Sequence, residues 1–258
     1  MGQVLAVLPA SGGVGATLLA AATATRAAAA LRSVAAVDLD AHGAGLDVAF
    51  GAEQVPGWRW EDLREVAGLV DGAALRRRLL HVDGVAVLSM SRAWRPPAPG
   101  WLTVVPDVVL GLRAAHDLVV VDAPREDAVL EVLAGFADAC VVVVGSRIGQ
   151  LAAAAVLLPR VRCLGVQPWV VLRGGHADLE DLVLDELDVA VVDRLRDDPR
   201  TAADLEAGVP AGSRGRGPVV EVADRILLRL RGTGTAPAGS TTRAGLAGSG
   251  AAWGGWRG

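Results

Sequence analysis

The chain has 258 residues, of which 52% are hydrophobic and 21% charged, and its formal net charge is −4 at pH 7. No apolar run reaches the ~18–20 residues of a transmembrane helix, no basic segment precedes an apolar core as in a secretion signal, and the charge gives no general attraction to nucleic acid or anionic lipid. These features predict a cytoplasmic protein. The chain contains no lysine and no asparagine, so no mechanism that needs either residue can run from this chain alone.

Short apolar runs alternate with helical patterns along most of the chain. Strands are predicted at residues 4–8, 34–38, 85–88, 118–122, 140–144 and 166–172, and helices at 18–31, 126–136, 150–158 and 179–187. Continuous β-branched runs separated by helices are typical of parallel strands covered on both faces. The pattern therefore predicts a three-layer, doubly wound α/β fold with a mainly parallel sheet.

The last part of the chain changes in composition. Residues 198–208 fit a short helix with a glycine stop, and residues 218–230 fit an amphipathic helix. From residue 232 onward the chain is rich in Gly, Ala, Ser and Thr without an apolar period, which predicts one domain over 1–231 and a disordered tail over 232–258. The alternative is that this tail is a docking peptide that binds through Trp253 and Trp256. Cys140 and Cys163 lie in apolar surroundings and are predicted to be buried, reduced thiols.

A glycine-rich turn follows the first strand and opens the first helix. Such glycines let backbone N–H groups converge on an anion at the positive end of a helix dipole. A dinucleotide-binding turn is one interpretation, with Asp38 as the acid after the second strand, but Leu18 stands where the third glycine belongs. The hydroxyl of Thr17 fits the Mg²⁺ ligand of a P-loop instead. The candidate phosphate-binding residues are Gly12, Gly13, Val14, Gly15, Ala16 and Thr17.

Several separated motifs together resemble the MinD/ParA ATPases, over about residues 3–231. Residues 11–17 resemble their deviant Walker A loop, K-G-G-x-G-K-[ST], and residues 38–47 their switch I. Residues 116–124 resemble the Walker B strand with switch II, and residues 198–210 the segment before the final helix. Residues 57–63 and 85–89 are similar to the actinobacterial CpaE-like, septum-site-determining branch, whose members often carry a receiver-like region before the first strand.

The resemblance assigns roles to three carboxylates, two at predicted strand ends and one just after a strand. It implies that Asp40 positions the attacking water, that Asp38 is its switch I partner, and that Asp122 holds Mg²⁺ through water while Thr17 binds it directly. ATP or ADP with Mg²⁺ is the implied cofactor. The alternative for Asp38 and Asp122 is that they only cap their strands.

The sequence departs from the family at the residues that carry positive charge. Ser11 stands at the position of the signature lysine, and Ala16 at that of the P-loop lysine, so the charge that normally neutralises the β- and γ-phosphates is missing. Arg173 stands where the adenine-contacting asparagine is expected. Arg125, beside the switch II proline, is a candidate replacement cation, with a solvated surface arginine as the alternative.

The resemblance implies a switch or scaffold that positions or assembles a Flp/Tad-type pilus or secretion apparatus, or that regulates the septum site. ATP binding is expected and hydrolysis is expected to be impaired; the rival interpretation is a pseudo-ATPase that acts only as a protein-interaction module. The resemblance implies protein partners in such machinery and a homodimer. It also implies recruitment to the membrane or septum through a partner. Trp58 and Trp60 are predicted to pack a lid against the sheet, and His42 has no second histidine or cysteine nearby for a metal site.

Overall fold

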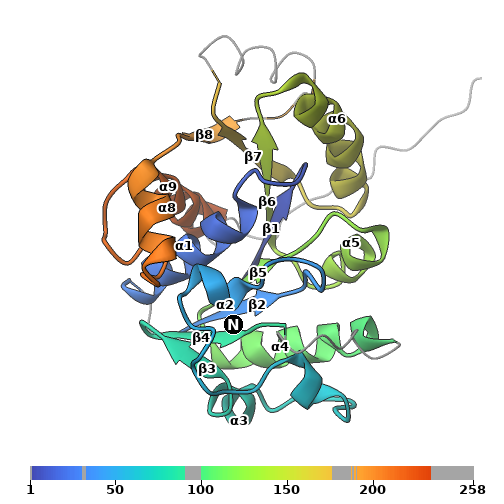
Figure 1. Ribbon diagram of the computed structural model, residues 1–258. Coiled ribbons are helices and arrows are strands. Elements are labelled where there is room, and N and C mark those ends of the chain that lie inside the picture. The colour runs from blue at the N-terminus through green and yellow to red at the C-terminus, as the bar shows by residue number, and fades with distance from the viewer. Residues whose placement is uncertain are drawn as a thin grey trace, which may run out of the picture.

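The computed structural model describes residues 2–30, 33–90, 100–175, 187, 189 and 191–233. Within these residues an eight-stranded sheet has the order β3-β4-β2-β5-β1-β6-β7-β8 (Figure 1). All neighbouring strands are parallel except β3 and β4. The strands are β1 (Gln3–Pro9), β2 (Val34–Asp38), β3 (Leu80–Val82), β4 (Val85–Leu88), β5 (Leu118–Asp122), β6 (Ala139–Gly145), β7 (Pro168–Arg173) and β8 (Val191–Leu195).

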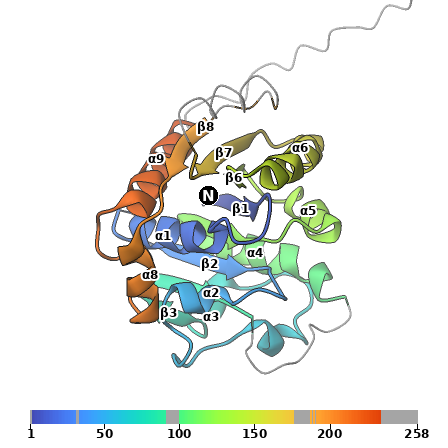
Figure 2. The ribbon, with the colours of Figure 1, turned by 45° about the horizontal axis from the view of Figure 1, so that its top comes forward.

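Helices cover both faces of this sheet, as Figures 1 and 2 show from two directions. They are α1 (Ala16–Ala28), α2 (Leu46–Ala49), α3 (Gly72–Arg76), α4 (Val105–Ala115), α5 (Asp127–Leu133), α6 (Ile148–Cys163), α8 (Pro199–Glu206) and α9 (Pro218–Thr233), with 3₁₀ turns η1 (Trp60–Leu63) and η2 (Trp101–Thr103). Across the described residues, none of the helices has both the length and the apolarity to span a bilayer.

The two faces of the sheet carry separate hydrophobic cores because side chains alternate along each strand. On β1, Val4, Ala6 and Leu8 join the core formed with α3, α4, α5 and α6. Leu5 and Val7 join the opposite core, formed with α1, α2 and α9. Burial on both faces explains why the strands are continuous apolar runs. The predicted three-layer, mainly parallel α/β fold is confirmed.

Small side chains allow α1 to lie between the sheet and α9. Its alanines at 20, 21, 22, 24 and 27 are buried. The two buried threonines of α1 satisfy their hydroxyls within the helix: Thr23 donates to the carbonyl of Leu19 at 2.7 Å and Thr25 to that of Ala21 at 3.0 Å. This helix can therefore be buried almost all round without an unpaired polar group.

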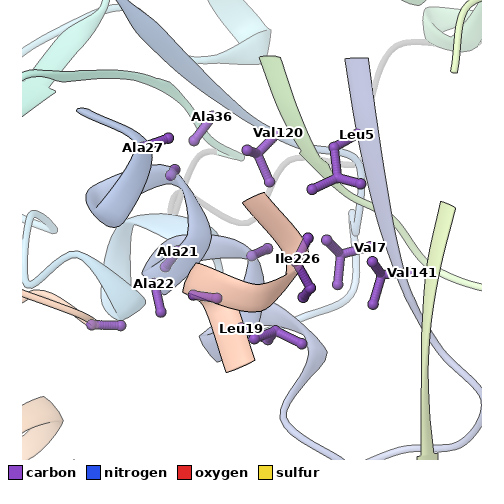
Figure 3. Packing of buried hydrophobic residues seen from close by; sticks show 14 of the residues in the cluster. Leu5, Val7, Leu19, Ala21, Ala22, Ala27, Ala36, Val120, Val141 and Ile226 are labelled. Carbon is purple, nitrogen blue, oxygen red and sulfur yellow. The ribbon is translucent and has the colours of Figure 1, made fainter. Parts of the chain in front are cut away.

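Replacing Ile226 with alanine is expected to lower the free energy of unfolding by about 2–5 kcal/mol, because the side chain fills the space between α9, α1 and the sheet. Ile226 is fully buried among residues that include Leu19, Val7 and Val141 (Figure 3). Leu228→Ala on the same helix is the control, since Leu228 is 65% exposed. Urea denaturation measures both; equal losses for the two variants would contradict the packing.

Several details differ from the sequence prediction. β3, β8 and α4 were not predicted, and α6 runs past Pro159 to Cys163. The prediction of two buried thiols is wrong for Cys163, which is exposed in the last turn of α6, and correct for Cys140. The predicted helix over 179–187 lies outside the described residues except for its last position. α9 continues to Thr233, past the predicted boundary at 231, and Trp253 and Trp256 lie outside the described residues.

Candidate nucleotide-binding site

The glycine-rich loop connects β1 to α1 at the carboxyl edge of the sheet. Gly13 and Gly15 have φ of 74° and 87°, in the left-handed region, and Gly15 is the N-terminal cap residue of α1. A Cβ built on Gly12 or Gly13 meets no atom within 4 Å, so this part of the loop opens to solvent. The first N–H groups of α1 have no partner within the helix and add to the positive end of its dipole. The loop therefore has the backbone of an anion site.

Two carboxylates are brought to this loop by strand register. Asp38 and Asp122 are directly paired at the ends of β2 and β5, and Asp122 is also paired with Val7 of β1. The hydroxyl of Thr17, in the first turn of α1, favours the ionised form of the Asp122 carboxylate and lowers its pKa. The structure thus joins three residues that lie far apart in the sequence.

Asp38 organises the loop that follows β2. Its carboxylate oxygens accept the backbone N–H groups of Asp40 and Leu46, each at 2.9 Å, and its carbonyl accepts the indole N–H of Trp60 at 2.6 Å. Burial raises the pKa of Asp38 from 3.8 to about 6. The backbone N–H donors lower this pKa, and the charge of Asp40 raises it slightly. These contacts support the strand-capping interpretation for Asp38.

Asp40 and Asp122 differ in exposure. Asp40 is partly buried and accepts the backbone N–H of His42 at 3.0 Å. Asp122 is 3% exposed. Burial raises the pKa of Asp122 well above 3.8, the charges of Asp38 and Asp40 raise it further, and the Thr17 hydroxyl opposes the rise. A cation at this edge of the sheet would relieve that repulsion.

The oxygen donors at this edge suit Mg²⁺ when phosphate is also bound. Among the described residues, no three His, Cys, Asp or Glu side chains are placed to hold a metal ion. Mg²⁺ usually keeps several waters and binds through one or two protein oxygens together with substrate phosphates. A hydroxyl from Thr17 and a carboxylate from Asp122 match this requirement. A magnesium site here would depend on the nucleotide.

The two positions at which the family has lysines carry no charge. Ala16 is 5% exposed and begins α1. The Oγ of Ser11 is buried, and no described residue forms a hydrogen bond with it. Arg125 lies on the switch II side, where its Nη1 donates to the carbonyl of Ala10 at 2.9 Å. Arg125, the candidate replacement cation, is therefore hydrogen-bonded to the main chain where the glycine-rich loop begins.

Sequence reasoning missed the contacts that hold the switch I region. Asp47 is fully buried, and its Oδ2 lies 3.4 Å from Nη2 of Arg59. Trp60 belongs to the core and Trp58 packs against it, so the predicted packing of these two side chains is confirmed. The alternating Trp-Arg-Trp sequence was the signal for this, because it places an arginine between two residues that face the core.

Replacing Gly15 with valine is expected to abolish phosphate and nucleotide binding by the loop. A side chain at φ 87° is strained by about 1–2 kcal/mol, and its Cβ would lie 3.3 Å from Nη1 of Arg173. Gly149→Val is the control, because a Cβ there meets nothing within 4 Å. Calorimetric titration with ATP and with phosphate measures the affinity. An unchanged affinity in Gly15→Val would make the loop a structural turn only.

Comparison with solved structures decides the fold type. A ParA family ATPase from Chlorobium tepidum aligns with a TM-score of 0.70 at 16% identity, covering 86% of this chain and 99% of that protein. MinD complexed with Mg-ADP from Pyrococcus horikoshii aligns with a TM-score of 0.67 at 16% identity, over 90% and 99%. The chain has the MinD/ParA P-loop fold. The MinC:MinD cell division complex of Aquifex aeolicus also aligns with this MinD/ParA fold, with a TM-score of 0.66 at 18% identity over 87% and 96%.

Relatives in sequence carry less functional information. No protein-family model matches the chain. Uncharacterized proteins from two strains of Mycobacterium tuberculosis are 35% identical over 213 residues, which is 80% of this chain. The chain spans 58% of the length of these relatives. The likeness extends over most of the MinD/ParA-type domain.

Proposed function

We propose that this chain is a nucleotide-controlled switch or scaffold of the MinD/ParA kind that binds ATP or ADP with Mg²⁺. The single observation that carries the proposal is the strand register that brings Asp122 to the glycine-rich loop, where the hydroxyl of Thr17 acts on its carboxylate. It links the first turn of α1, where phosphates would bind, to the acid that would hold the water shell of Mg²⁺. The P. horikoshii MinD with this fold was solved with Mg-ADP, which supports the same ligand class here.

Nucleotide hydrolysis by this site is proposed to be slow. Phosphoryl transfer depends on fixed positive charge beside the β- and γ-phosphates, and Ser11 and Ala16 supply none. Asp40 and Asp38 are the proposed catalytic pair, with Asp40 positioning the water. Because Asp38 is occupied by backbone donors, its part in catalysis would be to hold the loop that carries Asp40.

The cellular role is proposed by analogy with proteins of this fold. The MinC:MinD complex shows one such protein bound to a protein partner, and this supports a partner-docking role. The CpaE-like sequence features favour positioning or assembly of a Flp/Tad-type pilus or secretion apparatus, or regulation of the septum site. We propose a cytoplasmic protein that forms homodimers and reaches the membrane or septum through a partner.

The second candidate function is that of a pseudo-ATPase, which uses the candidate nucleotide-binding site only as a surface for protein interaction. The observation that favours it is the absence of lysine from the whole chain, which removes both Walker A charges at once. A dinucleotide-binding protein is disfavoured because the hydroxyl of Thr17 acts on the carboxylate of Asp122, an oxygen pair that suits Mg²⁺ with bound phosphate.

Calorimetry with ATP and ADP, with and without Mg²⁺, tests the proposal. We expect Mg²⁺-dependent binding in the natural protein and loss of the Mg²⁺ dependence in Thr17→Val, which removes the hydroxyl and keeps the branched shape. Thr23→Val is the matched control, because Thr23 lies in the same helix and its hydroxyl bonds only to the carbonyl of Leu19. A folded natural protein that binds neither nucleotide would favour the pseudo-ATPase candidate.

A further inference from the structure

Arg173 lies against the glycine-rich loop on the side opposite Arg125. It ends β7, two strands away from β1 in the sheet. Its Nη1 lies 3.3 Å from the position that a Cβ on Gly15 would occupy, and the next nearest atom there belongs to Leu195. The absence of a side chain at Gly15 therefore lets a guanidinium group approach the beginning of α1 closely.

The present partner of Arg173 is an exposed carboxylate. Nη2 of Arg173 lies 2.6 Å from Oδ1 of Asp197, which follows β8. The side chain of Arg173 is 28% exposed, whereas that of Asp197 is 81% exposed. An ion pair with one largely exposed member contributes little stability, on the order of 0–1 kcal/mol. An anionic ligand can therefore replace Asp197 as the partner of Arg173 at low cost.

A small cavity adjoins this guanidinium. It has a volume of about 190 Å³ and is lined by side chains that include Leu18, Leu195, Val219 and Arg173. Pockets that enclose a whole small molecule usually have about 300–1,000 Å³. This cavity suits one end of a ligand whose anionic part lies on the loop, with apolar contacts from Leu18 of α1 and Leu195 of β8.

We propose that Arg173 is the cation that binds the phosphates of the nucleotide beside Gly15, and that Asp197 holds the arginine in its place until the nucleotide arrives. The inference rests on the proposed nucleotide site. The chain has no lysine to supply this charge, and Arg125 donates to the Ala10 carbonyl at the other end of the loop. A guanidinium group forms paired, charge-assisted hydrogen bonds with phosphate oxygens, so it can exchange a carboxylate for a phosphate without loss of hydrogen bonds.

The test is calorimetric titration of the full chain with ATP, inorganic pyrophosphate and adenosine. Arg173→Ala should weaken binding of ATP and of pyrophosphate by about ten- to hundredfold, the effect of losing a hydrogen bond to a charged group. Asp197→Asn should strengthen the binding of both by up to about fivefold, because a competing carboxylate is removed. Arg225→Ala is the matched control, since it also breaks one surface ion pair, with Asp193, and should leave both affinities unchanged.

The outcomes separate this inference from the proposed function. Natural-type affinities in both Arg173→Ala and Asp197→Asn would overturn the role of Arg173 and leave nucleotide binding standing. Equal weakening of adenosine and ATP in Arg173→Ala would also overturn it, because the contact would then be with the nucleoside. A folded natural protein that binds neither ATP nor pyrophosphate would overturn the nucleotide site and this inference together. Asp197 is exposed, so Asp197→Asn keeps the test valid even where Arg173→Ala fails to fold.

Discussion

Replacing Ala16 with lysine is expected to raise single-turnover ATP hydrolysis by about two to three orders of magnitude. A lysine at the beginning of α1 places an ammonium group on the β- and γ-phosphates, where fixed charges contribute about 3–4 kcal/mol to the transition state. Ala16 is 5% exposed, so the long side chain must extend along the loop towards Gly12 and Gly13, where the structure leaves open space. Rapid-quench measurement of ADP formation in the presence of Mg²⁺ determines the rate.

Three variants control this experiment. Ala29→Lys adds the same charge at the exposed far end of α1 and should give no gain. Asp40→Ala should be inactive in both the natural and the Ala16→Lys backgrounds, because Asp40 is the residue proposed to position water. Arg125→Ala should slow the natural protein further, because Arg125 is the candidate replacement cation. Ordinary ATPase rates in the natural protein, with no gain from Ala16→Lys, would show that phosphate stabilisation comes from another source.

Replacing Asp122 with asparagine is expected to raise the free energy of unfolding of the metal-free protein at pH 7 by about 1–3 kcal/mol. Asp122 is buried beside Asp38, and both burial and this neighbouring charge raise its pKa. The substitution removes the repulsion, while the amide oxygen can still accept the hydroxyl of Thr17. Glu131→Gln, at an exposed position in α5, is the control and should change stability little.

The same variant should flatten the pH dependence of stability. Burial and the charge of Asp38 raise the pKa of Asp122 well above 3.8 in the folded protein, so the folded state takes up a proton at Asp122 before the unfolded state does as the pH falls. This stabilisation of the metal-free protein is lost as the pH rises through the raised pKa of Asp122, and Asp122→Asn removes it at every pH. Burial lowers the pKa of His116, which acts in the opposite direction below pH 6.5.

Urea denaturation of the natural protein and of Asp122→Asn, at pH 5 and at pH 7, measures the difference. Because His116 and Asp38 are present in both proteins, their contributions cancel in the comparison. A loss of stability at pH 7 in Asp122→Asn would contradict the prediction, and would mean that the ionised carboxylate is stabilised by donors other than Thr17.

Local sequence determined the central sheet and the loop. The runs of valine at 119–121 and 141–144 need burial on both faces, and this requirement alone predicts parallel strands between helices. The glycines at 12, 13 and 15 allow the backbone of an anion site directly after a buried strand. Asp38 and Asp122 could be placed at the same edge because parallel strands end at the same edge.

Only the tertiary structure decided which charges surround the loop. Arg173 and Gly15 are far apart in the sequence, and they meet because β7 and β1 flank β6 in the sheet. The pairing of Asp47 with Arg59 depends in the same way on how the segment before η1 folds back over β2. Cys163 is the opposite case. Its neighbours in sequence are apolar, but its side chain is exposed because this position of α6 faces away from the sheet. Periodicity and residue type determine what a segment can bury; which residues it contacts depends on strand order and on the direction in which each helix leaves the sheet.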